Sequence, residues 1–411
     1  MTVTLFHGDC LEVMPTLEEN SIDAIVCDPP YGLSFMGKDW DHGVPGVAFW
    51  KEALRVAKPG AHLLAFGGTR TFHRLAVAIE DSGWEIRDTV MWVYGSGFPK
   101  SHDVSKAIDK DAGAERSVVG SYRGASPNRV QTMGRPDHSG SGWSDDGMVS
   151  VTTPATPAAA QWAGWGTALK PAWEPIIMAR KPFTSTVAAN VLEWGTGAIN
   201  VDACRVGTEQ TVTQEKHEMY GTSSRKKDQE QGFRPRVFDN RVQPEKLNPP
   251  GRWPANLVHD GSDEVTELFP VTHGAGAARD ASEGTHRGYH DGVTNFSGAP
   301  AMRFGDTGSA SRFFYCAKAS KADRDGSTHP TVKPSSLMRY LCRLVTPPEG
   351  VILDPFMGSG STGKAAVLEG FSFVGIDQKA EYVDDARVRI ENAQKQVDAA
   401  SQQLSFSIEI E

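Results

Sequence analysis

The sequence has few cysteines and no pair of them at a metal-binding spacing. Its 411 residues include only Cys10, Cys27, Cys204, Cys316 and Cys342. An odd number of scattered cysteines without a CxxC pair argues against a structural zinc site and against a disulfide framework. We therefore expect reduced, buried thiols in a cytoplasmic protein. We find no other cluster of metal-ligating residue types, so no bound metal is expected.

Long apolar runs and a targeting signal are also lacking. No apolar stretch reaches the length needed to cross a bilayer. The beginning of the chain, MTVTLFHGDCLEVMP, has no basic region followed by an apolar one. No secretory signal and no membrane association are therefore expected.

A general excess of positive charge is lacking as well, because the formal net charge is −9. An acidic chain is not an obvious nucleic-acid binder, but phosphate contacts require only a local basic surface. Residues 203–252 hold ten Lys or Arg against seven Asp or Glu, a local charge of +3. The run Arg225, Lys226 and Lys227 lies within this segment. Charge alone leaves open whether the segment is a solvated loop or contacts phosphate.

Strand and helix patterns alternate in residues 1–100, which predicts a parallel sheet with crossover helices. The clearest strand is the apolar segment Ile22–Cys27, which ends at a Pro-Pro turn. Residues 101–310 are instead rich in Gly, Ser, Pro, Asn and charge, with long stretches of no clear period. One strand-like island, Pro175–Ala179, interrupts them. The α/β pattern returns in residues 311–395, so the domain is predicted to be discontinuous.

Two local expectations concern the second α/β segment. The sequence PSSLMRYLCRLVTPP predicts an amphipathic helix that Ser335 or Ser336 caps. The terminal QQLSFSIEIE is expected to be a tail or an added edge strand.

A glycine-containing turn follows a predicted strand and opens a predicted helix at Asp354-Pro-Phe-Met-Gly358-Ser-Gly360-Ser-Thr362. Glycines at such a turn allow the backbone to approach a ligand closely, as in nucleotide-binding folds. Asp377, at the end of the next strand, is suited to accept hydrogen bonds from a ribose diol. A tight structural turn would explain the glycines alone equally well, and the spacing is not that of a Walker loop.

The tetrapeptide Asp28-Pro29-Pro30-Tyr31 directly follows the strand Ile22–Cys27. The two prolines fix the backbone, so carbonyl groups there point in set directions. The carboxylate of Asp28 and the carbonyl of Pro29 can together accept both hydrogens of an amino group. Tyr31 offers a flat face on which a base can stack. The simpler interpretation is an Asp-Pro turn with a packed tyrosine.

In this order, the two motifs resemble those of the amino-methylating DNA methyltransferases, and specifically the permuted β group. The tetrapeptide comes first and the glycine motif follows 326 positions later. The lead-in FHGDCLEVMPTLEENSIDAIV, the segment HPTVKP and the island KPAWEPIIMARKP are similar to the same family. The wording of GFPKSHDVSKAI and RWPANLVHD is most similar to phage and prophage members.

The resemblance implies a doubly wound α/β methyltransferase sheet, mostly parallel with an antiparallel hairpin, together with a loop-rich target recognition region. It implies S-adenosylmethionine as the cofactor. The implied catalytic residues are Asp28, Pro29, Pro30 and Tyr31. The implied cofactor-binding residues are Asp9, Cys10, Asp28, His329, Thr331, Lys333, Asp354, Phe356, Gly358, Ser359, Gly360, Ser361, Thr362, Asp377 and Gln378.

The same resemblance divides the chain into six parts. Residues 1–100 form the catalytic part and residues 311–395 the cofactor-binding part of one methyltransferase domain. Between them are expected a flexible insert at the cleft (101–165), the catalytic hairpin strand (166–194) and the target recognition region (195–310). Residues 396–411 are expected to form the tail. Three tryptophans either line the DNA cleft or pack internally: Trp162, Trp165 and Trp173.

The implied reaction is methylation of N6 of an adenine flipped out of double-stranded DNA. Asp28 and Pro29 would hold the amino group and Tyr31 would stack on the base, so no covalent intermediate is needed. None of the five cysteines follows a proline, unlike the nucleophile of C5-cytosine enzymes. A homodimer in a bacterial or phage-infected cell is expected from the resemblance, and no partner nuclease is visible in the chain.

Several alternatives remain open at this point. The same grip on an amino group would serve N4 of cytosine, although DPPY favours adenine in the family. A phage enzyme of low sequence specificity is a further variant. RNA, a protein glutamine or a small molecule are other substrates, and a DNA-binding protein without catalysis is another class. Glutamine enzymes usually carry NPPY and lack a large middle region.

Overall fold

The computed structural model describes residues 1–32, 43–97, 101–123, 148–207, 212–213, 246–247, 250–273, 307–317, 321–327 and 332–408. These residues form two compact units. The first contains residues 1–95 and 173–411, and the second contains residues 96–172. None of the described helices is both long enough and apolar enough to cross a membrane.

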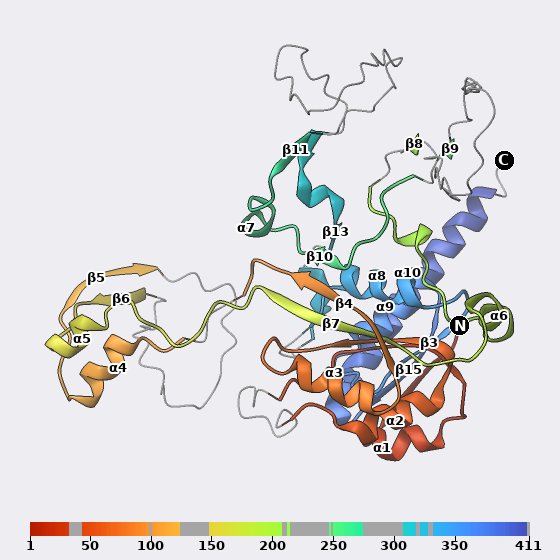
Figure 1. Cartoon of the computed structure of the whole chain (residues 1–411), viewed down its shortest axis with the longest axis horizontal. Helices are drawn as coiled ribbons and strands as arrows, with labels where there is room; N and C mark the ends of the chain where they lie inside the picture. Colours follow the sequence, from red (N-terminus) through yellow and green to blue (C-terminus); the bar gives the residue numbers. More distant parts are fainter. Residues whose placement is uncertain are drawn as a thin grey trace, which may run out of the picture. The chain divides into compact units, whose positions relative to one another are not determined.

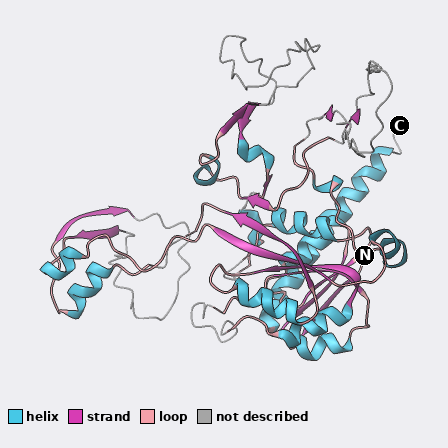
Figure 2. Cartoon of the chain, viewed as in Figure 1, coloured by secondary structure: helices cyan, strands magenta, loops and turns pink. Residues whose placement is uncertain are grey.

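A nine-stranded sheet organises the first unit (Figures 1 and 2). Eight of its strands are mutually parallel, and β7 alone runs antiparallel, between β3 and β4. In spatial order the strands are β1 (Val3–His7), β15 (Ser372–Asp377), β14 (Val351–Asp354), β2 (Ile22–Cys27), β3 (Ala57–Phe66), β7 (Trp173–Arg180), β4 (Glu85–Val93), β10 (Leu257–His259) and β13 (Tyr315–Cys316).

Helices cover both faces of this sheet, as Figure 1 shows. One face packs against α1 (Cys10–Val13), α2 (Val47–Val56) and α3 (Phe72–Asp81). The other packs against α8 (Ser335–Val345), α9 (Ser361–Glu369) and α10 (Ala380–Ile408). All six residues of β2 are buried, and from Ala24 to Cys27 its side chains alternate between the two cores, because successive residues of a strand point to opposite faces. The predicted mostly parallel α/β sheet is confirmed.

Shorter elements complete the first unit. The helical segments are η1 (Met14–Thr16), α6 (Val187–Trp194), η4 (Asp202–Cys204), α7 (Asp263–Thr266), η5 (Ala310–Phe313) and η6 (Lys321–Arg324). Two small antiparallel ladders pair β8 (Val212–Thr213) with β9 (Lys246–Leu247), and β11 (Val271–His273) with β12 (Thr307–Ser309). Strand β10 shows that the predicted recognition region also contributes to the central sheet.

The second unit consists of α4 (Val104–Asp111), α5 (Pro157–Gln161) and the hairpin of β5 (Val118–Arg123) and β6 (Met148–Thr152). The buried carboxylate of Asp109 links its parts, because it accepts hydrogen bonds from Arg116 at 2.5 Å and from the backbone N–H of Ala155 and Thr156 at 2.9 and 3.0 Å. The described residues of the predicted flexible insert therefore have regular structure. Trp162 and Trp165 meet edge to face at 5.0 Å and are exposed to solvent, so internal packing does not account for them.

One local prediction about the second α/β segment is wrong, and one of the two alternatives for the end of the chain is ruled out. No serine side chain caps α8: its N-cap is Pro334, and the Ser335 N–H donates to the carboxylate of Asp323 at 3.0 Å. A carboxylate twelve residues upstream thus satisfies the free N–H. The end of the chain is also no edge strand among the described residues, because α10 continues to Ile408. The alternating pattern of LSFSI does not form a strand, because these residues continue α10, a helix that packs on α9 and β15.

Candidate active site

The carboxyl ends of the parallel strands bring the predicted motif residues to one edge of the sheet. Asp28 follows β2, Asp354 ends β14 and Asp377 ends β15. Asp9 follows β1, whose last residue His7 pairs with Asp377. Strand β7 runs the other way, so its beginning, Trp173 and Glu174, reaches the same edge. Ligands of open α/β sheets bind at this edge.

A cluster of hydrogen-bonded charges surrounds the Asp28 carboxylate. One of its oxygens accepts from the Tyr31 hydroxyl at 2.7 Å, and the other accepts from Lys333 Nζ at 2.7 Å. The Tyr31 hydroxyl also lies 3.0 Å from a carboxylate oxygen of Glu174, and Lys333 Nζ lies 3.2 Å from the same oxygen. The Thr71 hydroxyl donates to the Tyr31 carbonyl at 2.6 Å and fixes the backbone there. We call Asp28, Tyr31, Glu174 and Lys333 the Asp28 cluster.

The electrostatics of the cluster keep both of its donors protonated. Burial alone would lower the pKa of Lys333, but the charges of Asp28 and Glu174 and their hydrogen bonds raise it above the ordinary lysine value. Burial raises the pKa of Tyr31 well above its usual value, and the two carboxylates raise it further. Lys333 also lies 4.7 Å from the ring centroid of Phe66. The site thus consists of two carboxylate acceptors, Asp28 and Glu174, that contact the charged ammonium of Lys333.

The glycine turn after β14 is built around the buried carboxylate of Asp354. This carboxylate accepts from the Thr362 hydroxyl at 2.6 Å and from the Phe356 N–H at 3.0 Å. Burial raises its pKa to about 7 against the opposing effect of these hydrogen bonds. Gly360 has a φ of 75°, and a Cβ there would lie 2.7 Å from the Cβ of Ala386. The hydrogen bonds of the buried Asp354 carboxylate to Thr362 and Phe356 therefore fix the conformation of the turn.

The edge beside this turn carries the groups that fit a nucleoside. The Gly358 N–H donates to the Asp377 carboxylate at 2.8 Å, and the Gln378 amide donates to the Asp9 carboxylate at 2.9 Å. Asp9 also accepts from the Leu11 N–H at 2.8 Å as the N-cap of α1. Each carboxylate oxygen has two lone pairs, so both groups can accept further bonds from ribose hydroxyls or an adenine amino group. This set of acceptors fits the adenosine part of S-adenosylmethionine.

The other predicted cofactor residues are placed differently. Phe356 is half-buried against Phe49 and Trp50, with ring centroids 6.0 Å from each. Burial raises the pKa of the Cys10 thiol to about 12, so this residue is a neutral core side chain. Lys333 lies in the Asp28 cluster. His329 and Thr331 lie outside the described residues, as does the basic run Arg225, Lys226 and Lys227.

Sequence reasoning missed two charged residues that organise the site. Glu174 was passed over within the strand-like island, although an acidic residue between Trp173 and Pro175 at the start of that strand was a visible signal. Arg389 of α10 is fully buried and braces the glycine turn. Its guanidinium bonds the Ser359 carbonyl and hydroxyl, the latter at 2.9 Å, and reaches the Asp323 carbonyl at 2.6 Å.

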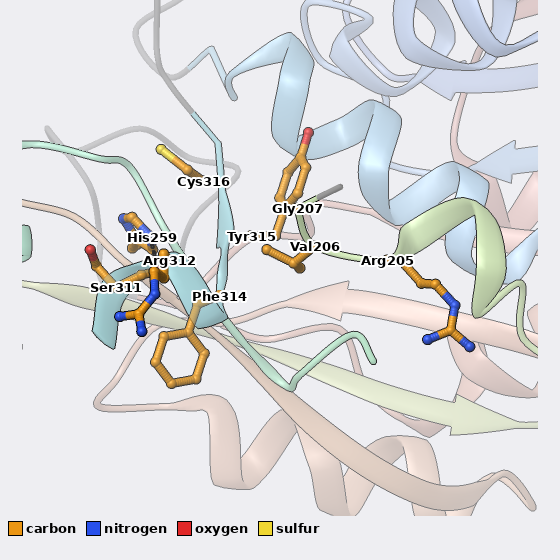
Figure 3. A pocket seen from close by; sticks show the side chains of 9 residues that line it. All are labelled: Arg205, Val206, Gly207, His259, Ser311, Arg312, Phe314, Tyr315 and Cys316. Carbon is orange, nitrogen blue, oxygen red and sulfur yellow. Dashed lines mark hydrogen bonds between the residues drawn. The ribbon is translucent and has the colours of Figure 1, made fainter. Parts of the chain in front are cut away.

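An open hollow of about 430 Å³ lies elsewhere in the first unit (Figure 3). Its lining comes from residues 205–207, 259, 311–312 and 314–316, and so does not include the Asp28 cluster. Its two arginines already have internal partners. Arg205 pairs with Asp202 at 2.8 Å, and Arg312 donates to the Ser309 carbonyl at 2.6 Å. The lining also includes His259 and Cys316, and no residue of the Asp28 cluster contributes to it.

Comparison with known proteins agrees with this geometry. The family model of N6 and N4 methyltransferases, described as DNA methylase, matches residues 22–388. The Type II methyltransferase M.HindIII of Haemophilus influenzae is 22% identical over 420 residues, which cover 91% of this chain and 90% of the relative. The Type II methyltransferase M2.DpnII of Streptococcus pneumoniae is 42% identical over 71 residues, 17% of this chain and 26% of the relative.

Solved structures of the same kind also align with the chain. The cytosine-N4-specific PvuII DNA methyltransferase is 13% identical with a TM-score of 0.42, covering 97% of this chain and 93% of that one. The complex of M1.HpyAVI with SAM is 15% identical with a TM-score of 0.39, covering 94% and 98%. The family assignment rests on the sequence match, which spans most of the chain. The protein belongs to the DNA methylase family of N6 and N4 amino methyltransferases, whose methyl donor is S-adenosylmethionine.

Proposed function

We propose that this protein transfers a methyl group to N6 of an adenine flipped out of double-stranded DNA. The observation that carries the proposal is the Asp28 cluster, in which a DPPY turn holds acceptors at the carboxyl edge of the sheet. An exocyclic amino group has two hydrogens, and the Asp28 carboxylate and the Pro29 carbonyl can accept one each. This grip directs the nitrogen lone pair out of the plane of the base, where it can act as a nucleophile.

Other residues of the site orient the two reactants. Tyr31 has its hydroxyl and its carbonyl held by Asp28, Glu174 and Thr71, so its ring has a fixed position against which a base can stack. Asp9, Asp377 and Gln378 are proposed to hold the adenosine part of the cofactor, and the turn Gly358–Thr362 its methionine part. S-adenosylmethionine, when bound, supplies an electrophilic methyl group on a sulfonium. Catalysis by these residues is positioning and electrostatic stabilisation.

The choice of adenine rests on the DPPY tetrapeptide, since the same grip would serve N4 of cytosine. The recognition segments are proposed to lie in residues 195–310, and the second unit is proposed as a further DNA contact through its exposed tryptophans. A homodimer, a cytoplasmic location and a role in restriction-modification or in phage DNA protection remain predictions.

Mass spectrometry of nucleosides tests the proposal directly. DNA is incubated with S-adenosylmethionine and either the wild type, Asp28→Ala or Asp384→Asn, whose carboxylate is exposed on α10. We expect N6-methyladenine with the wild type and with Asp384→Asn, and roughly a hundredfold to a thousandfold less with Asp28→Ala, as when a group specific to the transition state is removed. N4-methylcytosine would contradict the choice of base, and no methylated base on any DNA would contradict the reaction.

A further inference from the structure

Glu174 reaches the active site because of the one antiparallel strand in the central sheet. It is the second residue of β7, and its register partner is Trp92 near the end of β4. Pro175 follows it, which keeps the backbone of Glu174 extended. The parallel strands β3 and β4 end where β7 begins, so a side chain at the start of β7 lies at the edge that carries Asp28.

Two donors converge on the Glu174 carboxylate. The Tyr31 hydroxyl is 3.0 Å away and Lys333 Nζ is 3.2 Å away. Tyr94 is also near, because burial and then the charge of Glu174 raise the pKa of its hydroxyl. The Tyr31 hydroxyl has a single hydrogen, so it donates to Asp28 or to Glu174 at any moment. Glu174 is thus coupled to Asp28 twice, through Tyr31 and through Lys333.

The charges of the cluster do not cancel. It contains two carboxylates, Asp28 and Glu174, against one ammonium, Lys333, which leaves a net charge of −1. The Lys333 side chain is 10% exposed, Glu174 19% and Asp28 25%, so water screens this charge only partly. Without Glu174, Asp28 and Lys333 would form a neutral pair.

We infer that Glu174 is a positioning residue that gives the Asp28 cluster its net negative charge and thereby favours the cationic methyl donor over the neutral product. The inference rests on the proposed methyl transfer, in which the S–CH3 bond breaks as the N–CH3 bond forms and S-adenosylhomocysteine leaves as a neutral thioether. The positive charge passes from the sulfonium to the amino nitrogen, which then releases one proton to solvent through its hydrogen bond to Asp28. A fixed negative charge beside that path stabilises the cation at each stage. Glu174 also holds Lys333 and Tyr31, the two groups that orient the Asp28 carboxylate.

Calorimetric titration of the full-length protein with S-adenosylmethionine and with S-adenosylhomocysteine, in the absence of DNA, tests this role. Glu174→Gln keeps the shape of the side chain and removes its charge. We expect it to weaken S-adenosylmethionine binding on the order of tenfold or more, since the cluster loses its net negative charge. Binding of the neutral product should change less than threefold, so the ratio of the two Kd values rises. Glu174→Asp should keep most of the wild-type ratio.

Glu85→Gln is the matched control, because Glu85 pairs with Arg180 of β7 at 2.8 Å, at the opposite end of the same strand pair. It should leave the ratio of Kd values unchanged. Equal weakening of both ligands by Glu174→Gln would show a merely structural role and overturn the inference. Unchanged binding of both ligands would also overturn it. If Glu174→Gln does not fold, ligand binding to the wild type still tests the inference. An analogue with an ammonium in place of the sulfonium should bind about tenfold more tightly than the product, and equal binding overturns the inference.

These outcomes are separate from those of the nucleoside assay. A wild type that discriminates between the charged and neutral ligands but methylates no DNA would support the role of Glu174 and contradict the proposed substrate. A wild type that methylates adenine, with an unchanged ligand ratio in Glu174→Gln, would do the reverse.

Discussion

The buried carboxyl group of Asp354 makes the stability of the protein depend on pH in a calculable direction. Its pKa rises from 3.8 to about 7, chiefly because of burial. Between these two values the folded protein keeps the proton that the unfolded chain has released. Raising the pH through this window therefore favours unfolding, by about 1.4 kcal/mol per pH unit and about 4 kcal/mol in all. Above about pH 7 the folded protein releases the proton too, and the effect ends.

Asp354→Asn removes this titration while it preserves the local hydrogen bonds. The asparagine oxygen can accept from the Phe356 N–H, and its amino group can donate to the Thr362 hydroxyl, which is 2.6 Å from the native carboxylate. The variant thus imitates the protonated form. Its unfolding free energy minus that of the wild type should grow by about 2 to 3 kcal/mol between pH 5 and pH 7. Urea unfolding at half-unit pH intervals measures this difference.

Asp384→Asn supplies the control, because it makes the same chemical change on the exposed face of α10. Its difference from the wild type should stay within about 0.5 kcal/mol across the same range. If the Asp354→Asn curve runs parallel to that of the wild type, the folded pKa of Asp354 is not raised and the reasoning from burial fails. A difference that shrinks as the pH rises would mean that the sign is wrong.

Two further predictions concern the stability of the first unit. Arg389→Lys should destabilise the protein by about 3 kcal/mol, because lysine lacks the planar fork whose two separate nitrogens bond the Ser359 and Asp323 carbonyls. It should also weaken S-adenosylmethionine binding, and urea unfolding together with calorimetry measures both effects. Replacing residues 96–172 by a short glycine linker should leave the first unit cooperatively folded, within about 2 kcal/mol of the full chain. Loss of its cofactor binding would contradict the independence of this unit.

The parts of the fold that could be predicted are those with a local signal. Strand β2 spans Ile22–Cys27 as predicted, because a fully buried parallel strand is a largely apolar run, interrupted here only by Asp23, that a Pro-Pro turn ends. The glycine turn and the strand at Pro175–Ala179 could be predicted for similar reasons, since turn residues and branched apolar residues favour a local structure within a few positions.

The parts that could not be predicted depend on partners far away in the chain. Lys333 is 305 positions from Asp28, and only the folded sheet brings the two residues together. Arg389 stands among charged residues of a helix, where a solvent-facing side chain is the ordinary expectation. It is buried where its guanidinium bonds the carbonyls of Ser359 and Asp323. A periodic pattern in the sequence carries no information about such distant partners. Asp323 replaced the predicted serine cap of α8 for the same reason.

The position of the second unit in the chain explains how so long an insert is compatible with an intact active site. The chain leaves the central sheet after β4 and returns at β7, and Val93 pairs with Trp173 across these two strands. A connection of two residues would suffice there, as in any hairpin. The ends of residues 96–172 are therefore held close together by the sheet itself, and lengthening a closed loop costs little. Glu174 is the second residue after the return, so the strand pair that accommodates the insert also fixes the carboxylate beside Asp28.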